Sequence, residues 1–397
     1  MWKTWSETPE PPDFPGESPA REDEAAGSNA GREREQRARA YNRTHRYLRL
    51  ADFALGWAWL LALLFAGWSI ALRDAAGQVT SVYWLALPCY LLLVTGIGKL
   101  IGLPLDFYSG YVIEHRYGLS TETPRKWAKD QLKGFLLGTV LALAAAELVY
   151  LLIRTLPEWW WLAAWAAFLV LVVALANLAP VLLFPLFFKF RPLEDEELKR
   201  RLLQLSERAG TRVRGVYEWK LSEKSRKANA ALAGWGNTRR IIVADTLLDR
   251  YTHDEIEAIF AHELAHHVYN HIPKGLALQA IASLAGFWLA AQALQRFTPR
   301  FGFRGLDDFA NLPLLLVVSG VLSLVLLPVV NAVSRYFERQ ADDYALRSIP
   351  STGPFITSME KLAEQNLAER RPNPVIEFLF HSHPSIARRV ARARARA

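Results

Sequence analysis

Cysteine is almost absent from this chain of 397 residues, since Cys89 is the only one. A disulfide within the chain is therefore excluded, and so is a metal site built from several thiolates. The first forty residues contain no apolar run, so no cleavable signal peptide is expected. No recognisable nucleic-acid-binding module accompanies the formal net charge of +8, and no nucleic-acid partner is expected. Anionic lipid headgroups are a sufficient partner for the excess of basic residues.

Long apolar runs dominate what the chain does contain. Six of them are long enough to cross a bilayer, which are too many and too long for the core helices of a soluble protein. We predict spans at about Ala51–Leu72, Val82–Leu103, Phe135–Ile153, Trp160–Phe188, Gly275–Leu294 and Leu312–Val330. Basic residues cluster before the first span and between the second and third. The positive-inside rule therefore places both termini and the segment containing His262 in the cytosol.

The predicted fold class is mainly α and integral to the membrane, with a cytosolic domain that contains a small β-sheet. We expect strands at Val213–Lys220 and Arg240–Ala244, a short strand within 223–237, and a soluble helix from Pro192 to about Ala209. The expected organisation is a disordered cytosolic tail (1–45), a membrane domain of four spans with a cytosolic loop at 104–134 (46–188), a cytosolic domain (189–274), a transmembrane hairpin (275–333) and a C-terminal part of the cytosolic domain (334–397).

The stretch His262-Glu263-Leu264-Ala265-His266 carries the clearest chemical signal. Thr252 and Glu255 form a capping pattern that predicts a helix from Asp249 to about Asn270. On a helix, His262 and His266 share one face and can bind one metal ion. Glu263 is then placed to accept a proton from a metal-bound water. This pattern is typical of a zinc peptidase.

Zinc usually needs a third protein ligand, and the best candidate is Glu338. Asp342 follows four residues later, so both carboxylates face the same way on a helix. We predict that Glu338 binds the single zinc ion and that Asp342 holds a histidine ligand by its second ring nitrogen. The alternative is an exposed helix with charges paired at this spacing. Imidazole and carboxylate ligands do not by themselves prove zinc.

Two other classes of protein use or retain such a motif. An intramembrane protease of the site-2 type carries it inside an apolar span, but here the motif is flanked by the polar residues Asp254, Glu255, Glu257, His267 and Asn270. A non-enzymatic membrane scaffold with a structural zinc site has no need for a base such as Glu263. Of the neighbouring histidines, His267 and His271 fall on other helix faces and are predicted not to bind the metal.

An ordered set of motifs resembles the M48 metallopeptidases, and most closely the Ste24 type, the CAAX prenyl proteases. It covers about residues 40 to 390. The blocks are His262–His266, Ser334 to Asp342, Glu114 to Ser120, Ala228-Asn229-Ala230, Thr238 to Leu248, and His381 to Ser385 with Arg389. The resemblance implies a gluzincin-like zinc protease domain joined to the spans, and a water-filled chamber that Glu147, Asn177 and Gln279 could line.

The resemblance also implies roles for residues outside the metal motif. His383 and Arg389 would stabilise the oxyanion of the tetrahedral intermediate, and Asn229 and Ala230 would bind the substrate as an added strand. The substrate would be a peptide or membrane protein, lipidated or not. Eukaryotic members have one more span at the N-terminus, and the polar tail here points to a bacterial inner-membrane relative. An HtpX-like quality-control metalloprotease is the nearest alternative within the family.

Overall fold

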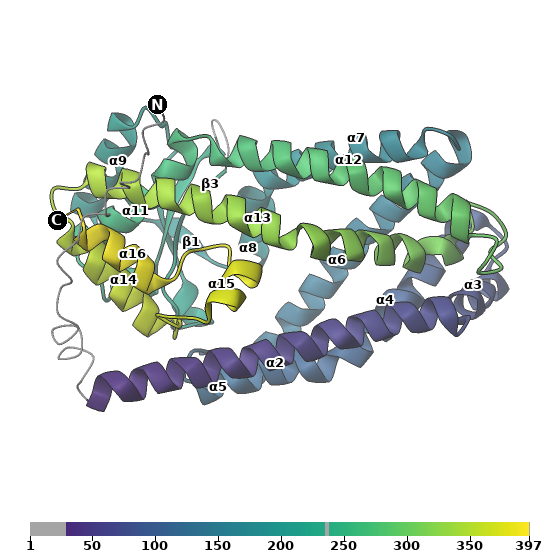
Figure 1. Cartoon of the computed structure of the whole chain (residues 1–397), viewed down its shortest axis with the longest axis horizontal. Coiled ribbons are helices and arrows are strands. Elements are labelled where there is room, and N and C mark those ends of the chain that lie inside the picture. The colour runs from purple at the N-terminus through teal and green to yellow at the C-terminus, as the bar shows by residue number, and fades with distance from the viewer. Residues whose placement is uncertain (1–28, 235–237, 397) are drawn as a thin grey trace, which may run out of the picture.

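The computed structural model describes residues 29–234 and 238–396. Long helices extend from a soluble domain at one end of the molecule to a far end that contains α3 (Figure 1). The long-helix part consists of α2 (Asn29–Phe65), α3 (Trp68–Val79), α4 (Tyr83–Phe107), the π-helix η1 (Tyr108–Ile113), α5 (Glu114–Arg116), α6 (Pro124–Thr155), α7 (Trp160–Leu178), the π-helix η2 (Ala179–Leu183), α8 (Phe184–Phe187), α12 (His271–Phe297), the 3-10 helix η5 (Phe309–Asn311) and α13 (Leu312–Ser348).

The soluble domain combines short strands with shorter helices. It consists of β1 (Phe190–Pro192), α9 (Glu196–Arg208), β2 (Val216–Trp219), the 3-10 helix η3 (Leu221–Glu223), β3 (Ala230–Ala233), β4 (Arg240–Ala244), α10 (Asp245–Leu248), α11 (His253–Val268), α14 (Gly353–Gln365), α15 (Pro374–Phe380) and α16 (Ile386–Arg394). Its apolar core forms where α9, α11 and α14 pack against the sheet.

The described residues include six helices that are long and apolar enough to cross a membrane, which confirms the predicted number. They are Gly31–Phe65, Tyr83–Arg116, Pro124–Thr155, Trp160–Phe187, His271–Phe297 and Phe309–Ser348. Proline explains why the fourth of these helices, Trp160–Phe187, is not a regular α-helix near its C-terminal end. Pro180 lies in the π-helix η2, because a proline ring cannot take part in the normal hydrogen-bond ladder of an α-helix.

The prediction for the first span is wrong at its C-terminal end. Helix α2 stops at Phe65, and Gly67 has a left-handed backbone with φ of 72° that starts α3 in a new direction. The apolar composition continues across this break, so hydropathy alone does not reveal it. Ser69 and Arg73 on α3 are buried polar residues, which explains why this segment is not a simple continuation of a lipid-facing helix.

The predicted disorder of residues 1–45 is wrong for residues 29–45, and the remainder lies outside the described residues. This part belongs to α2 and contacts the soluble domain. The Asn42 side chain donates to the carbonyl of Leu367 at 2.6 Å, and just after this part Arg46 pairs with Glu369 at 2.9 Å. A polar, charged sequence favours disorder when it is considered alone. These distant partners stabilise it as a helix.

The sheet has four strands in the order β1-β2-β4-β3. Strand β2 runs parallel to β4, and β1 and β3 are antiparallel to their neighbours. All three predicted strands occur, whereas β1 was missed because three residues ending in Pro192 carry little strand signal. Strand β3 therefore forms one edge of the sheet, beside the helix α11 that carries the metal motif.

The predicted domain boundaries at 274 and 333 fall inside continuous helices. Helix α12 begins at His271, and α13 runs from Leu312 to Ser348 without a break. Helix α13 is thus both a membrane span and the element that carries Glu338. Because a helix is a stiff rod, the position of Glu338 is coupled directly to the packing of the membrane helices.

Candidate metal centre

Helix α11 presents the two histidines, and a capping box defines its start. The Thr252 hydroxyl accepts a hydrogen bond from the Glu255 backbone at 3.3 Å, and the Glu255 carboxylate accepts one from the Thr252 backbone at 2.9 Å. The predicted capping by Thr252 and Glu255 is therefore confirmed, and the helix begins at His253, four residues after the predicted Asp249. Most of the helix is buried in the core of the soluble domain. The positions of His262 and His266 are consequently set by core packing.

Helix α13 crosses α11 and brings Glu338 to the two histidines. The Nε2 atom of His262 lies 3.2 Å from Oε2 of Glu338, and Nε2 of His266 lies 3.5 Å from Oε1. The three ligand atoms all lie within 4.8 Å of one another. The structure thus brings together the three residues that the sequence predicts as metal ligands.

The environment of Glu338 fits a bound cation. Its side chain is buried, and apart from the 3.2 Å contact with Nε2 of His262, Oε2 has no hydrogen-bond partner among the described residues. A buried carboxylate oxygen with so little hydrogen bonding is costly unless a cation compensates its charge. Two imidazoles and one carboxylate also leave a fourth tetrahedral position for water, as in catalytic zinc sites. The chemistry of the donor set therefore suits a divalent metal ion.

Asp342 holds the second ring nitrogen of His262. Its Oδ1 atom lies 2.9 Å from Nδ1 of His262. Arg389 of α16 donates to the same carboxylate, with Nη2 2.6 Å from Oδ1 and Nε 3.0 Å from Oδ2. All three side chains are buried. The carboxylate selects the tautomer of His262 that carries its proton on Nδ1, which leaves the lone pair on Nε2 for a metal.

Burial and neighbouring charges set the protonation states in the site. Burial lowers the pKa of His262, but hydrogen bonds to Asp342 and Glu338 outweigh it and raise this pKa to about 9. Burial and repulsion from His262 lower the pKa of His266 to about 4. Burial raises the pKa of Glu263, whose side chain makes no hydrogen bond within the described ranges. A carboxylate with a raised pKa and no partner suits proton transfer near neutral pH.

The two residues predicted to stabilise an oxyanion lie on different sides of the site. His383 lies at the mouth, with Nε2 3.3 Å from Oε1 of Glu338 and Nδ1 2.8 Å from the Ser382 hydroxyl. Arg389 lies behind His262, where its guanidinium is occupied by Asp342. The oxyanion role of both residues stays a prediction, and the geometry favours it for His383 rather than for Arg389.

Asn229 and Ala230 lie at the edge strand, as the sequence predicts. Asn229 is exposed, and its carbonyl accepts a hydrogen bond from Ala244 at 3.0 Å just before β3 begins. His267 fastens the strand to α11, because its Nε2 atom lies 3.1 Å from the carbonyl of Leu232. His267 therefore has a structural partner, and it is absent from the metal-ligand group found among the described residues.

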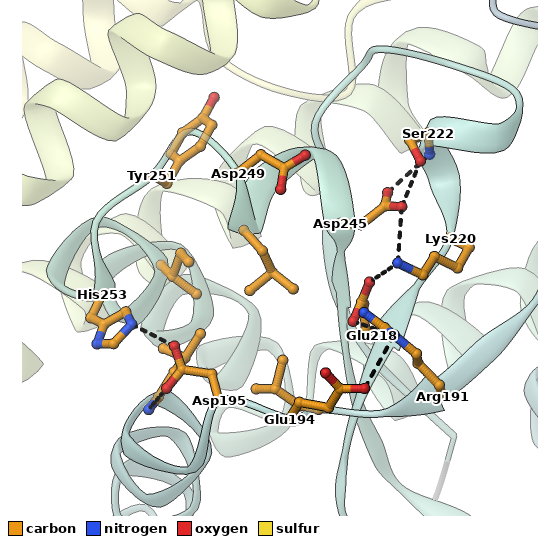
Figure 2. Close-up of a pocket in the computed structure, with 14 residues that line it drawn as sticks. Arg191, Glu194, Asp195, Glu218, Lys220, Ser222, Asp245, Asp249, Tyr251 and His253 are labelled. Atoms are coloured by element: carbon orange, nitrogen blue, oxygen red, sulfur yellow. Dashed lines mark hydrogen bonds and ion pairs between the residues drawn. The ribbon is translucent and has the colours of Figure 1, made fainter.

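His253 belongs to a separate pocket of about 400 Å³ that contains none of the candidate metal ligands (Figure 2). Its Nε2 atom lies 2.8 Å from Oδ2 of Asp195. On the opposite wall, Glu218 lies between Arg191 and Lys220 and pairs with both. These charges compensate one another on that wall. His253 lies at the first position of α11.

His271 is a residue whose importance the sequence did not reveal. It is buried, and its Nδ1 atom lies 3.1 Å from Nδ1 of His266. It lies outside the group of three candidate ligands found among the described residues, and its contact with His266 was missed. Spacing carried no such signal, because the chain leaves α11 at Tyr269 and turns through Asn270, which has a φ of 54°.

Comparison with known proteins identifies the family. A family model described as peptidase family M48 matches residues 192–397, and one described as the CAAX prenyl protease N-terminal region, with five membrane helices, matches residues 24–189. The uncharacterized metalloprotease YhfN of Bacillus subtilis is 32% identical over 360 residues, which cover 90% of this chain and 84% of the relative. CAAX prenyl protease 1 of Saccharomyces cerevisiae is 28% identical over 326 residues, covering 76% of this chain and 70% of the yeast protein.

The crystal structure of Ste24p from S. mikatae has the same fold. The TM-score is 0.81 at 24% sequence identity, and the match covers 90% of this chain and 88% of the Ste24p chain. The chain belongs to peptidase family M48 and is a multi-pass membrane metalloprotease of the Ste24 and CAAX protease type. The resemblance that the sequence motifs indicated is therefore confirmed.

Proposed function

We propose that this protein is a zinc endopeptidase that hydrolyses peptide bonds at the centre formed by His262, His266 and Glu338. The observation that carries the proposal is the convergence of these three side chains, with Asp342 behind His262. Zinc bound there would polarise the scissile carbonyl and acidify a water molecule. The buried Glu338 carboxylate, whose Oε2 atom contacts only Nε2 of His262 among the described residues, is the feature of this chain that supports a cation in the site.

The side chains around the ligands would perform the proton transfers. Glu263 would accept a proton from the attacking water and then deliver it to the leaving amine, for which its raised pKa is suited. His383, at the open side of Glu338, would donate a hydrogen bond to the developing oxyanion. Arg389 would act indirectly, by holding the Asp342 carboxylate in the position that orients His262.

The substrate would bind as an additional strand on β3. This strand is an edge of the sheet, and Asn229 and Ala230 lie at its start. Main-chain hydrogen bonds to an edge strand give affinity without a strict sequence requirement. A peptide that added to β3 would pass beside α11, because His267 holds the two elements together. We infer that the substrate is a peptide or the exposed segment of a membrane protein.

We further propose that the enzyme lies in a bacterial inner membrane with its metal centre and both termini in the cytosol. The basic residues around the first three spans support this orientation. The named activity of the yeast relative suggests lipidated CAAX peptides as the first substrates to test. Incubation with a prenylated peptide and its unprenylated counterpart, with cut sites determined by mass spectrometry, would show whether the lipid is recognised.

The variant Glu263→Gln separates catalysis from metal binding. The amide cannot accept the proton, so peptide cleavage is expected to fall by at least about 100-fold while about one zinc ion per chain is retained. A chelator should abolish cleavage by the unaltered enzyme, and added zinc should restore it. Unchanged cleavage by Glu263→Gln would rule out the proposed base, and a zinc-binding protein without chelator-sensitive cleavage would instead be a membrane scaffold.

A further inference from the structure

The second metal ligand, His266, is connected to a chain of neutral side chains. Its Nδ1 atom lies 3.1 Å from Nδ1 of His271, and Nε2 of His271 lies 3.0 Å from Oε1 of Gln340. The Gln340 amide in turn donates to the Tyr336 hydroxyl at 3.2 Å. His262 differs, because the carboxylate of Asp342 faces its second nitrogen. The two histidines are thus oriented by different chemistry.

Metal binding would determine the direction of every hydrogen bond in this chain. Nε2 of His266 faces Glu338, so a neutral His266 that binds metal through Nε2 carries its proton on Nδ1. That proton can be donated to His271 only if Nδ1 of His271 is unprotonated. His271 must then carry its own proton on Nε2, where the Gln340 carbonyl oxygen accepts it. One arrangement of protons satisfies all three groups.

Packing holds His271 in this orientation. The residue is only 4% exposed, and its ring stacks on Phe337 with a centroid separation of 4.3 Å and an interplanar angle of 9°. Phe337 precedes the ligand Glu338 on α13, and Gln340 follows it by two positions. The same helix therefore supplies the third ligand and both contacts that orient His271. Phe337 and Gln340 fix the His271 ring in advance, so its Nδ1 atom can accept a hydrogen bond from His266 without a further loss of conformational freedom.

We propose that His271 and Gln340 are positioning residues for the metal centre, and that they keep His266 in the tautomer and orientation that bind the ion. This inference rests on the proposed zinc site. His271 and Gln340 would orient His266, just as Asp342 and Arg389 orient His262. In this relay, the Nδ1 atom of His266 faces a neutral histidine and not a carboxylate, so the site gains orientation on this side without further buried negative charge.

Zinc affinity of the full chain in detergent tests the proposal, measured by competition with a chelating dye in a Glu263→Gln background. His271→Leu removes the acceptor at similar volume and is expected to weaken zinc binding by about 10- to 100-fold. His271→Asn retains an acceptor near the position of Nδ1 and should recover the affinity to within about threefold. Equal zinc affinity in His271→Leu and the parent protein would overturn the proposal, as would equal losses in the Leu and Asn variants.

Gln340 gives a test that does not depend on a buried substitution, because this side chain is partly exposed. Gln340→Met is expected to weaken zinc binding by about three- to tenfold, whereas Gln340→Glu keeps the acceptor and should bind zinc at least as tightly as the parent. Parent-like affinity in Gln340→Met would contradict the relay. His253→Leu serves as a control for loss of a histidine far from the centre, and its zinc affinity should not change.

The same measurements distinguish failure of this inference from failure of the proposed function. If the parent binds no zinc, or if His266→Ala binds it unchanged, the metal site itself is wrong. If the parent binds zinc through His266 but the His271 and Gln340 variants behave like the parent, only the positioning role is wrong. Melting temperatures of the zinc-free variants, compared in pairs, exclude a general packing defect as the cause.

Discussion

At the residue scale, Glu255 contributes more than its position in a capping box suggests. Besides the Thr252 backbone, its carboxylate accepts a hydrogen bond from Lys361 of α14 at 2.7 Å. Burial raises the pKa of Glu255, but the bonds from Lys361 and Thr252 outweigh it and hold this pKa below its usual range. The start of the metal-binding helix is thus fastened to a helix that follows it by about a hundred residues.

This lowered pKa predicts a pH dependence of stability. A carboxylate with a lower pKa in the folded than in the unfolded protein stabilises the fold above its unfolded pKa of about 4.3, and this contribution is lost as the pH falls. We expect Glu255→Gln to lower the free energy of unfolding by about 1–2 kcal/mol at pH 7. In thermal melts, the difference in stability between Glu255→Gln and the parent protein should become smaller as the pH is lowered from 5 to 4. A difference that grew in acid would contradict this assignment.

Single residues also show how far the site could be predicted from sequence. His262, His266 and Glu263 form a local pattern, and the spacing of Glu338 and Asp342 puts both on one helix face, so the sequence could identify them. Arg389 and His271 act through contacts with residues far along the chain or around a sharp turn. No local periodicity encodes such contacts, so only the family resemblance singled out Arg389, and His271 was left without a role.

At the scale of elements, three separate segments meet just before the edge strand β3. The Glu114 carboxylate accepts hydrogen bonds from the Tyr41 hydroxyl at 2.5 Å and from Lys227 at 2.9 Å. These residues come from α2, from α5 and from the segment that leads into β3. A backbone bond from Arg226 to the Leu119 carbonyl, at 2.8 Å, continues the contact. The motif that starts at Glu114 therefore positions β3, the strand to which the substrate is proposed to bind.

A double-mutant cycle measures this coupling. Glu114→Gln and Lys227→Met should each lower the free energy of unfolding. The double variant should lower it by less than the sum of the two single effects, because both substitutions remove the same ion pair. We expect a coupling energy of about 1 kcal/mol, since the pair is partly exposed. Thermal unfolding of the four proteins gives the value. Additive effects would mean that the two side chains stabilise the fold independently.

The turn between β3 and β4 depends on glycine at position 234. Gly234 has a φ of 93°, and a Cβ atom there would lie 2.6 Å from the carbonyl oxygen of Thr238. Gly234→Ala is therefore expected to destabilise the protein by about 1–3 kcal/mol, through backbone strain and steric overlap. Gly275→Ala is the matched control, because a Cβ atom added at that position would meet no neighbouring side chain within 4 Å and its φ is ordinary. Equal melting temperatures for the two variants would contradict this explanation.

At the scale of the whole molecule, a buried ion pair closes the end of the helical part that is remote from the metal centre. Arg73 on α3 lies 2.5 Å from Asp308, which precedes α13, and both side chains are buried. Asp308 also accepts the backbone N–H groups of Arg304 at 2.9 Å and Ala310 at 3.1 Å. The pair thus joins the break after the first span to the loop between the last two.

Replacing Arg73 alone should lower the free energy of unfolding more than replacing both Arg73 and Asp308. Arg73→Leu leaves Asp308 buried and unpaired, and we expect a loss of about 3–5 kcal/mol. Adding Asp308→Asn removes the orphaned charge and keeps an acceptor for the backbone groups, so part of the stability should return. Melting temperatures in detergent provide the comparison. No recovery in the double variant would mean that the arginine acts by packing instead of charge compensation.

The sequence alone determined the number of apolar spans, the helix of His262 and His266 and most of the strands, because each depends on residues close together along the chain. It also offered Glu338 as the candidate third ligand, but only folding brings that side chain to the two histidines. Only the tertiary structure decided that α2 extends into the polar N-terminal region, that Gly67 ends the first span early, and that His271 and Arg389 support opposite sides of the metal centre. These features depend on partners brought together by folding, whose energies appear in no local pattern.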